Sequence, residues 1–165
     1  MVRGMLRKIS AVGFSALTLL LAACGPGLRA QGSAAIAGFL AVAQGDDRRA
    51  FEAGVDRPAL RTDLSGQLAE LGRTRGVDVG APSEFALDRM ITSQAVRAAA
   101  AQVAPGWPAR PTAAQVLPHM KVIDPSHVCL EEAASRRCLL TFAQEDGAWR
   151  LVGLRFIPPT PEPSA

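Results

Sequence analysis

The chain of 165 residues has no tyrosine, only two histidines and only three cysteines, and these scarcities limit the chemistry it can carry. A metal centre needs several histidine, cysteine or carboxylate ligands at suitable spacing, and no such cluster appears around His119 or His127. The cysteines include no Cys-x-x-Cys pair, so a thiol–disulfide oxidoreductase is not indicated. We therefore predict no metal, no cofactor and no redox activity.

The chain also lacks a hydrophobic run long enough to cross a membrane comfortably. Residues 9–21 are apolar apart from one glycine and three hydroxyl residues, whereas a spanning helix needs about 20 apolar residues. Arg3, Arg7 and Lys8 precede this run, and small residues follow it. That order is typical of a secretory signal, so we predict that residues 1–23 are a signal peptide.

The signal ends in Leu21-Ala22-Ala23-Cys24, which resembles the lipobox of bacterial lipoproteins. The resemblance implies cleavage before Cys24, lipidation of its sulfur and acylation of the new amino group. Several acyl chains give durable membrane attachment. Gly25, and not aspartate, follows the cysteine, which by resemblance to lipoprotein sorting favours the outer membrane over the plasma membrane. We expect a lipid-anchored protein of the bacterial cell envelope that faces the periplasm; an ordinary signal with an incidental cysteine is the alternative.

The excess of positive charge belongs to the signal. The whole chain carries 18 basic and 15 acidic residues. Three of the basic residues and none of the acidic ones lie in residues 1–23, so 15 of each sign remain. A nucleic-acid-binding domain keeps its basic surface in the folded part of the chain. The sequence therefore predicts no nucleic-acid partner.

The length from Cys24 onward suits one domain with a real core. Residues 24–32 contain glycine and proline and show no apolar periodicity, so they are predicted to be a tether. Residues 33–158 form the predicted domain. Residues 159–165 are rich in proline and are predicted to be a disordered tail.

Helical periodicity runs through the first part of this domain. Ser33 is a candidate N-cap, and apolar residues follow it at helical spacing. The clearest helix lies between Asp56, its candidate N-cap, and Gly76, its candidate stop. One stripe of this helix is apolar: Leu60, Leu64, Leu68 and Leu71. We interpret the stripe as core, with the lining of a ligand pocket as the alternative. Ser83 and Thr92 are candidate N-caps of two further helices, Ser93 being the alternative to Thr92.

The last third of the domain changes to strand-like patterns. Four candidates lie at residues 119–124, 127–132, 136–144 and 148–157. Helices first and strands afterwards predict an α+β domain, in which N-terminal helices pack on one face of a C-terminal antiparallel meander.

Cys129 and Cys138 are the best candidates for a covalent feature. In a hairpin centred between residues 133 and 134, Cys129 would oppose Cys138 and Glu131 would oppose Arg136. Directly opposed Cα atoms lie about 4.5–5.5 Å apart, a separation that a disulfide bridges. Because export leads to an oxidising compartment, we predict a structural disulfide. Ala-Ala is a poor two-residue turn, so a wider loop is the alternative.

Two polar clusters are interpreted as structural features. Residues 124–129 bring Asp, Ser, His and Cys together, but the members of a catalytic triad meet in space and are usually distant in sequence. We interpret this stretch as a turn that enters a strand. Arg57 and Arg61 lie one helical turn apart near Asp56 and Asp63. A solvated, ion-paired face is expected there, with an anion or lipid-headgroup contact as the alternative.

Three stretches resemble the bacterial family called domain of unknown function 2939. They are residues 45–46, 55–61 and 67–68 taken together, then "MITSQAVRAAA", and finally "GAWRLVGLRFIP". Ser93 stands where the family usually has proline. The resemblance spans roughly residues 36–158 and carries no assigned activity. It implies a small α+β cone of the cystatin-like or nuclear-transport-factor-like kind.

These observations favour a non-enzymatic envelope lipoprotein that binds an envelope protein or a small apolar ligand. The first alternative is a hydrolase or isomerase built in the cavity of such a cone, which needs a buried Asp/His pair such as Asp88 and His127. The second alternative is a structural or assembly factor of the outer membrane. No catalytic residue is predicted.

Overall fold

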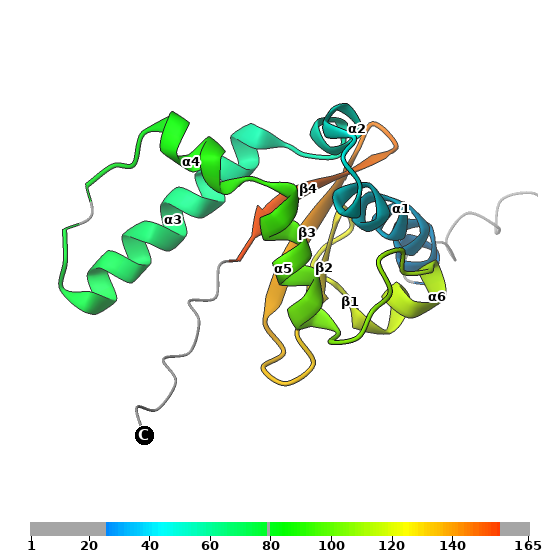
Figure 1. Ribbon diagram of the computed structural model, residues 1–165. Helices are drawn as coiled ribbons and strands as arrows, with labels where there is room; N and C mark the ends of the chain where they lie inside the picture. Colours follow the sequence, from blue (N-terminus) through cyan, green and yellow to red (C-terminus); the bar gives the residue numbers. More distant parts are fainter. Residues whose placement is uncertain (1–25, 79, 156–165) are drawn as a thin grey trace, which may run out of the picture.

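The computed structural model describes residues 26–78 and 80–155. In this part of the chain the helices come first and the strands last (Figure 1). The helices are α1 (Pro26–Gln44), α2 (Arg48–Ala53), α3 (Arg57–Arg75), α4 (Glu84–Met90), α5 (Ser93–Val103) and α6 (Ala113–Val116), followed by the 3₁₀ turn η1 (Leu117–His119). The strands are β1 (Met120–Val122), β2 (His127–Glu131), β3 (Cys138–Glu145) and β4 (Ala148–Leu154). The predicted α+β class is confirmed.

The four strands form one sheet in the order β1-β2-β3-β4, and every neighbouring pair is antiparallel. The predicted meander is therefore confirmed. Val128 of β2 opposes Phe142 of β3, and the ring of Phe142 meets the ring of Phe39 in α1 edge-on at 5.7 Å between centroids. This face of the sheet closes the core against α1, and α5 packs over β3 (Figure 1).

The first helix buries the apolar face that its spacing predicts. Ile36, Phe39, Leu40 and Ala43 are all buried. The rings of Phe39 and Phe51 stack at 5.7 Å between centroids, which ties α2 to the same core. Aromatic contacts of this kind add to the stabilisation that burial already gives.

Helix α3 begins and ends as its sequence predicts. The carboxylate of Asp56 accepts a hydrogen bond of 3.0 Å from the amide of Ala59, and Pro58 lies in the first turn, where a missing N–H costs least. Gly76 takes the left-handed conformation with φ of 64°, which favours glycine, and its amide bonds back to the last turn. Ser83 and Thr92 also cap α4 and α5 as predicted.

The predicted start of the domain is wrong. Helix α1 begins at Pro26, so most of the stretch 24–32 that we expected to be a tether is helical, and Ser33 lies inside the helix. The physical reason is tertiary packing: a Cβ built on Gly32 would lie 3.2 Å from the indole of Trp149, so this turn of α1 rests directly on β4. Local periodicity misses such a contact between distant parts of the chain.

The predicted signal peptide, Cys24 and the predicted tail at residues 159–165 lie outside the described residues. No helix within residues 26–78 and 80–155 combines the length and hydropathy needed to cross a membrane.

Candidate functional site

The leucine stripe of α3 divides into a buried half and a half that lines a groove. Leu60 and Leu64 are buried in the core, with 0% and 1% of their surface exposed. Leu68 and Leu71 are half-buried, and with Leu64 and Met90 they form the apolar floor of a groove of about 560 Å³. We call this hollow the α3 groove. The core interpretation therefore holds for Leu60 and Leu64, and the ligand-pocket interpretation stays a prediction for Leu68 and Leu71, which line the hollow.

The groove exists because α3 is longer than the strand that supports it. Asp63 accepts a hydrogen bond of 3.0 Å from the amide of Leu154, the last residue of β4, and Gln67 donates one of 2.9 Å to the carbonyl oxygen of Leu154. These bonds cover the end of an edge strand that would otherwise expose unpaired backbone groups. Beyond Gln67 the helix continues for about two turns. Figure 1 shows the far end of α3 clear of the sheet.

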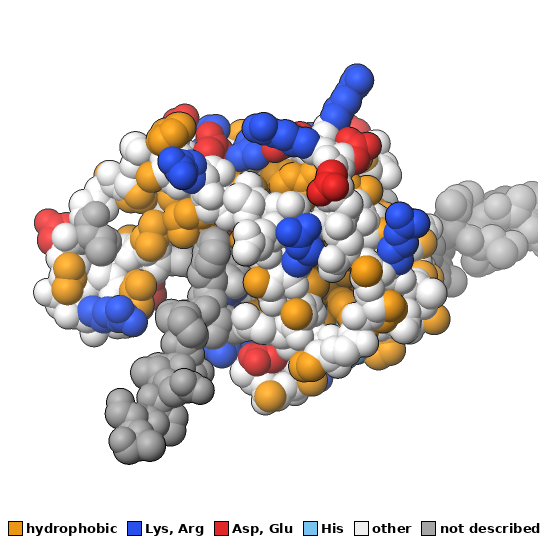
Figure 2. Space-filling view, in the orientation of Figure 1, with side chains coloured by type: hydrophobic (Ala, Val, Ile, Leu, Met, Phe, Trp, Pro, Cys, Tyr) orange, Lys and Arg blue, Asp and Glu red, His pale blue; other side chains and the backbone are white. Residues whose placement is uncertain are grey.

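The surface around the groove is partly apolar. Figure 2 shows hydrophobic side chains at the surface over the end of the molecule that carries α3 and α4. Met90, at the end of α4, is half-buried and lines the groove together with Leu71. Ligand sites typically combine such an apolar floor with a few placed polar groups.

The rim of the α3 groove carries two acidic residues, Asp63 and Glu70, and two arginines, Arg137 and Arg155, so its formal charges balance. Asp63 already accepts hydrogen bonds from Leu154 and from Gln67, and Glu70 is paired with Arg73 outside the groove. Arg155 is exposed, and no side-chain partner for it occurs among the described residues. Arg155 is therefore the group on this rim that can meet an anionic ligand.

Arg137, the second basic residue of this rim, is only loosely held. Its Nη2 lies 3.6 Å from a carboxylate oxygen of Glu132, and its Nε donates to the Ser135 hydroxyl at 3.1 Å. The Arg137 side chain is 54% exposed, so this contact contributes little stability. Its guanidinium can reorient toward a ligand at small cost.

A larger cleft, of about 870 Å³, lies between α2, α4 and the start of α5, and three of its charged residues, Glu52, Arg57 and Asp88, are paired with one another. Arg57 binds Glu52 through two hydrogen bonds of 2.6 Å and reaches Asp88 at 3.1 Å. Arg61 binds Asp88 through two bonds of 2.9 and 2.7 Å. The expected ion-paired face is present, with Glu52 and Asp88 as the partners in place of Asp56 and Asp63.

This network fixes the protonation states of its members. Hydrogen bonds from Arg61, and then from Arg57, hold the pKa of Asp88 below its ordinary value. The hydrogen bonds from Arg57 likewise lower the pKa of Glu52. Both carboxylates therefore stay ionised, and neither is suited to general-base work near neutral pH. The network holds α4 against α3 and engages three of the charged residues that line the larger cleft.

Residues 124–127 form a turn whose geometry differs from that of a catalytic triad. The Asp124 oxygen Oδ1 accepts hydrogen bonds from the backbone amides of Ser126 and His127 at 2.8 and 2.9 Å. The Ser126 hydroxyl and the same Asp124 oxygen both contact Nδ1 of His127, at 3.0 and 2.9 Å. In a triad the serine contacts the other ring nitrogen, Nε2. The amide of Ser126, and then His127, lower the pKa of Asp124 to about 2.

Asp88 and His127, the pair that the enzyme hypothesis requires, do not come together. Asp88 is bound by Arg57 and Arg61, whereas His127 is bound by Asp124 and Ser126. Each member of the pair is engaged in a local structural contact.

The disulfide between Cys129 and Cys138 is present, but the register around it differs from the prediction. Cys129 opposes Thr141, and Glu131 opposes Cys138, because a bulge shifts the pairing between Leu130 and Glu131. The two cysteine Cα atoms lie 5.5 Å apart. The wider loop, our alternative, is the one that forms, and a two-residue turn centred between residues 133 and 134 was wrong.

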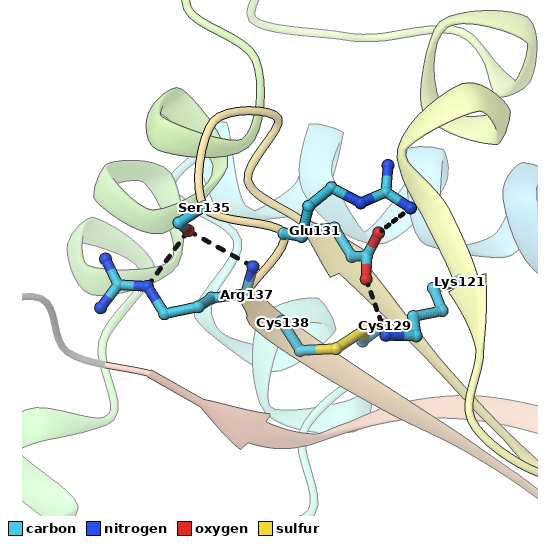
Figure 3. Close-up of a disulfide and its surroundings, with 7 residues drawn as sticks. Lys121, Cys129, Glu131, Ser135, Arg137 and Cys138 are labelled. Atoms are coloured by element: carbon cyan, nitrogen blue, oxygen red, sulfur yellow. Dashed lines mark hydrogen bonds and ion pairs between the residues drawn. A yellow bond between two sulfur atoms is a disulfide. The ribbon is translucent and has the colours of Figure 1, made fainter.

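A buried carboxylate accompanies this disulfide. The side chain of Glu131 is 7% exposed, and it pairs with Lys121 at 3.0 Å and with Arg136 at 3.1 Å (Figure 3). The Glu131–Arg136 contact is the one that the predicted register suggested, reached through a different backbone path. Lys121, on the neighbouring strand β1, had no signal in the local pattern.

The chain was compared with protein families, curated proteins and solved structures. No family model, no curated protein and no solved structure matches it. The resemblance to domain of unknown function 2939, with its cone-like fold, therefore stays a prediction, as does the lipobox at Cys24.

Proposed function

We propose that this protein is an envelope-anchored lipoprotein, held by lipids on Cys24, whose domain binds a small amphiphile in the α3 groove without transforming it. The amphiphile has an apolar chain and one acidic group. The observation that carries the proposal is the apolar floor of the groove beside Arg155, for which residues 26–78 and 80–155 offer no side-chain partner. No cofactor takes part.

The floor of the groove supports binding of an apolar chain. Leu68 and Leu71 are half-buried, so a chain that covers them removes further apolar surface from water. Complete burial of an exposed leucine gives about 1.5–3 kcal/mol, so two half-buried leucines and Met90 together supply a few kcal/mol. The volume of about 560 Å³ lies within the usual range of small-ligand sites.

The rim supports an acidic head group. Arg155 offers a fixed guanidinium fork that matches a carboxylate or a phosphate in two parallel hydrogen bonds. Arg137 lies on the same rim and can add a second charged contact.

The alternatives have less support. A hydrolase or isomerase would need Asp88 and His127 in one cavity, and each of them is held in a separate cluster. An assembly factor would need a surface for a protein partner, and the α3 groove is of the size that suits a small molecule.

The test measures binding of palmitate and of hexadecanol to the purified protein by isothermal titration calorimetry. Leu68→Gln places an amide in the floor of the groove and should weaken both ligands about tenfold or more, equivalent to about 1.4 kcal/mol. Val77→Gln is the matched control, because Val77 is 57% exposed and lies outside the groove. Unchanged binding in Leu68→Gln, or no binding by the unaltered protein, contradicts the proposal.

The acidic group is tested separately. Arg155→Gln should weaken palmitate and leave hexadecanol unchanged, since only palmitate carries a charge. Arg150→Gln is the control, because Arg150 is an exposed arginine on β4 that lies outside the groove. Equal effects of Arg155→Gln on both ligands would remove the head-group contact from the proposal.

The anchor has its own measurement. The intact mass of protein extracted from bacterial membranes should correspond to the chain from Cys24 onward plus lipid, and Cys24→Ala should abolish that species. An unlipidated protein that begins at another residue would contradict the anchor and leave the groove to be tested by itself.

A further inference from the structure

We propose that Cys129, Glu131 and Cys138 form a redox-controlled site for a divalent cation of the zinc type. The disulfide closes the site. A dithiol reductant opens it, and the two thiolates and the carboxylate then bind the metal.

The three ligand atoms already lie close together. The two sulfurs and a carboxylate oxygen of Glu131 are all within 4.8 Å of one another. Zinc–sulfur and zinc–oxygen bonds of about 2.3 and 2.1 Å put neighbouring ligands of a tetrahedral ion about 3.5–4 Å apart. The ligands come from two hydrogen-bonded strands, β2 and β3, which hold them in place. Once the sulfurs separate, small side-chain movements suffice to surround an ion.

The carboxylate of Glu131 can bind a metal ion in addition to its present partners. Its Oε1 is buried and makes no hydrogen bond of good geometry, although the Lys121 ammonium lies 3.0 Å away as an ion pair. Arg136, one of the two cations beside it, is 78% exposed and can move outward when a metal arrives, while Lys121 stays near the site.

The charges of the site also balance. Two thiolates and one carboxylate carry three negative charges, and a divalent cation offsets two of them. Lys121, which opposes Cys129 across β1 and β2, offsets the third. Three protein ligands leave a fourth position for water, the arrangement of an open zinc site.

The opening step is a thiol–disulfide exchange. A thiolate of the dithiol attacks the Cys138 sulfur, because Cys138 is half-buried whereas Cys129 is fully buried. A mixed disulfide forms and Cys129 leaves as a thiolate. The second thiol of the reductant then displaces Cys138 and closes its own disulfide. Two electrons pass to the protein, and the two protons of the dithiol pass to the cysteines. Metal binding releases those protons to solvent.

The experiment uses the full-length protein with Cys24→Ser, so that no third thiol competes, and Co²⁺ as the probe. A phosphine, which donates two electrons and becomes the phosphine oxide with an oxygen from water, reduces the disulfide without adding a thiol. We expect the thiolate-to-cobalt absorption band in the reduced protein and no band in the oxidised protein, with Zn²⁺ displacing Co²⁺.

Variants of the two neighbouring acids decide the role of Glu131. Glu131→Gln should weaken Co²⁺ binding about tenfold or more, since even outer contacts of a metal site are worth that much. Glu132→Gln, which removes the next carboxylate along the chain, should leave binding unchanged. Far-UV circular dichroism recorded beside each titration shows whether the reduced chain is folded.

The proposal is overturned if the reduced protein shows no band, or if Glu131→Gln binds Co²⁺ as tightly as the unaltered protein. The second result also covers a reduced chain that has unfolded and binds cobalt through its thiols alone. Neither result bears on the α3 groove, since none of the three ligand residues lines it.

Discussion

Truncation of Leu60 and of Leu71 should separate the two halves of the α3 stripe. Leu60 has none of its surface exposed, so Leu60→Ala leaves a cavity and should lower the free energy of unfolding by about 2–5 kcal/mol. Leu71 is half-buried and faces the groove. Leu71→Ala removes only partial burial and gains slightly in helix propensity, so its cost should be about 1 kcal/mol or less.

Urea unfolding followed by far-UV circular dichroism gives both losses of unfolding free energy, provided that the slope of this free energy against urea concentration is the same in the variants and the unaltered protein. Total stabilities of about 5–15 kcal/mol leave Leu60→Ala folded under native conditions. Palmitate binding should show the opposite order, with a loss in Leu71→Ala and little change in Leu60→Ala. Equal losses of stability in the two variants would place Leu71 in the core and refute the argument for the groove.

Three further predictions concern the rest of the domain. Replacement of Cys129 and Cys138 by alanine should lower the free energy of unfolding by about 2–3 kcal/mol, because the bond closes a loop with a sequence separation of only 9; calorimetry would measure it. Gly54→Ala should cost about 1–3 kcal/mol in the same assay, since its Cβ would lie 2.5 Å from the packed ring of Phe39. Asp124 has a folded-state pKa of about 2, below its usual 3.8, so its stabilising contribution is complete above pH 3.8 and is lost as the pH falls through 2. A carboxyl titration by nuclear magnetic resonance with a midpoint near 3.8 would contradict this.

Local sequence signals predicted the parts of the fold that depend on nearby residues. Asp56 and Gly76 mark the ends of α3 because capping needs only a side-chain acceptor at one end and a left-handed residue at the other. Alternation of apolar residues likewise indicated the strands of the meander. The start of α1 escaped prediction because its first turns are stabilised by contacts such as that between Gly32 and Trp149, more than a hundred residues apart.

The hairpin that carries the disulfide shows a second limit of prediction from sequence. The cysteine pair was identifiable from type, spacing and compartment. Its register was not, because a bulge at Leu130 and Glu131 changes the count of residues on one strand, and a bulge has no compulsory sequence signal. The opposition of Glu131 to Cys138, which places a carboxylate beside the sulfurs, follows from that bulge.

The sequence predicted only part of the α3 groove. The leucine stripe identified its floor, but the spacing of a helix cannot say where the supporting sheet ends. That boundary is set by Asp63 and Gln67 meeting Leu154, residues separated by 91 and 87 positions. Arg155 becomes a rim residue for the same reason, and nothing in its local sequence distinguishes it from the other arginines.

The start of α1 at Pro26 affects how the proposed anchor would orient the groove relative to the membrane. With the lipids on Cys24 and the helix beginning at Pro26, two peptide units separate membrane from domain, a reach of about 7 Å at most. A tether of nine residues would have let the domain turn freely; two units hold the start of α1 against the bilayer surface. Figure 1 shows that start and the far end of α3 on opposite sides of the molecule. On the proposed anchor the far end of α3 would lie away from the membrane, so we predict that the ligand of the groove arrives through the periplasm, or from a facing surface, and not by lateral diffusion in the anchoring leaflet.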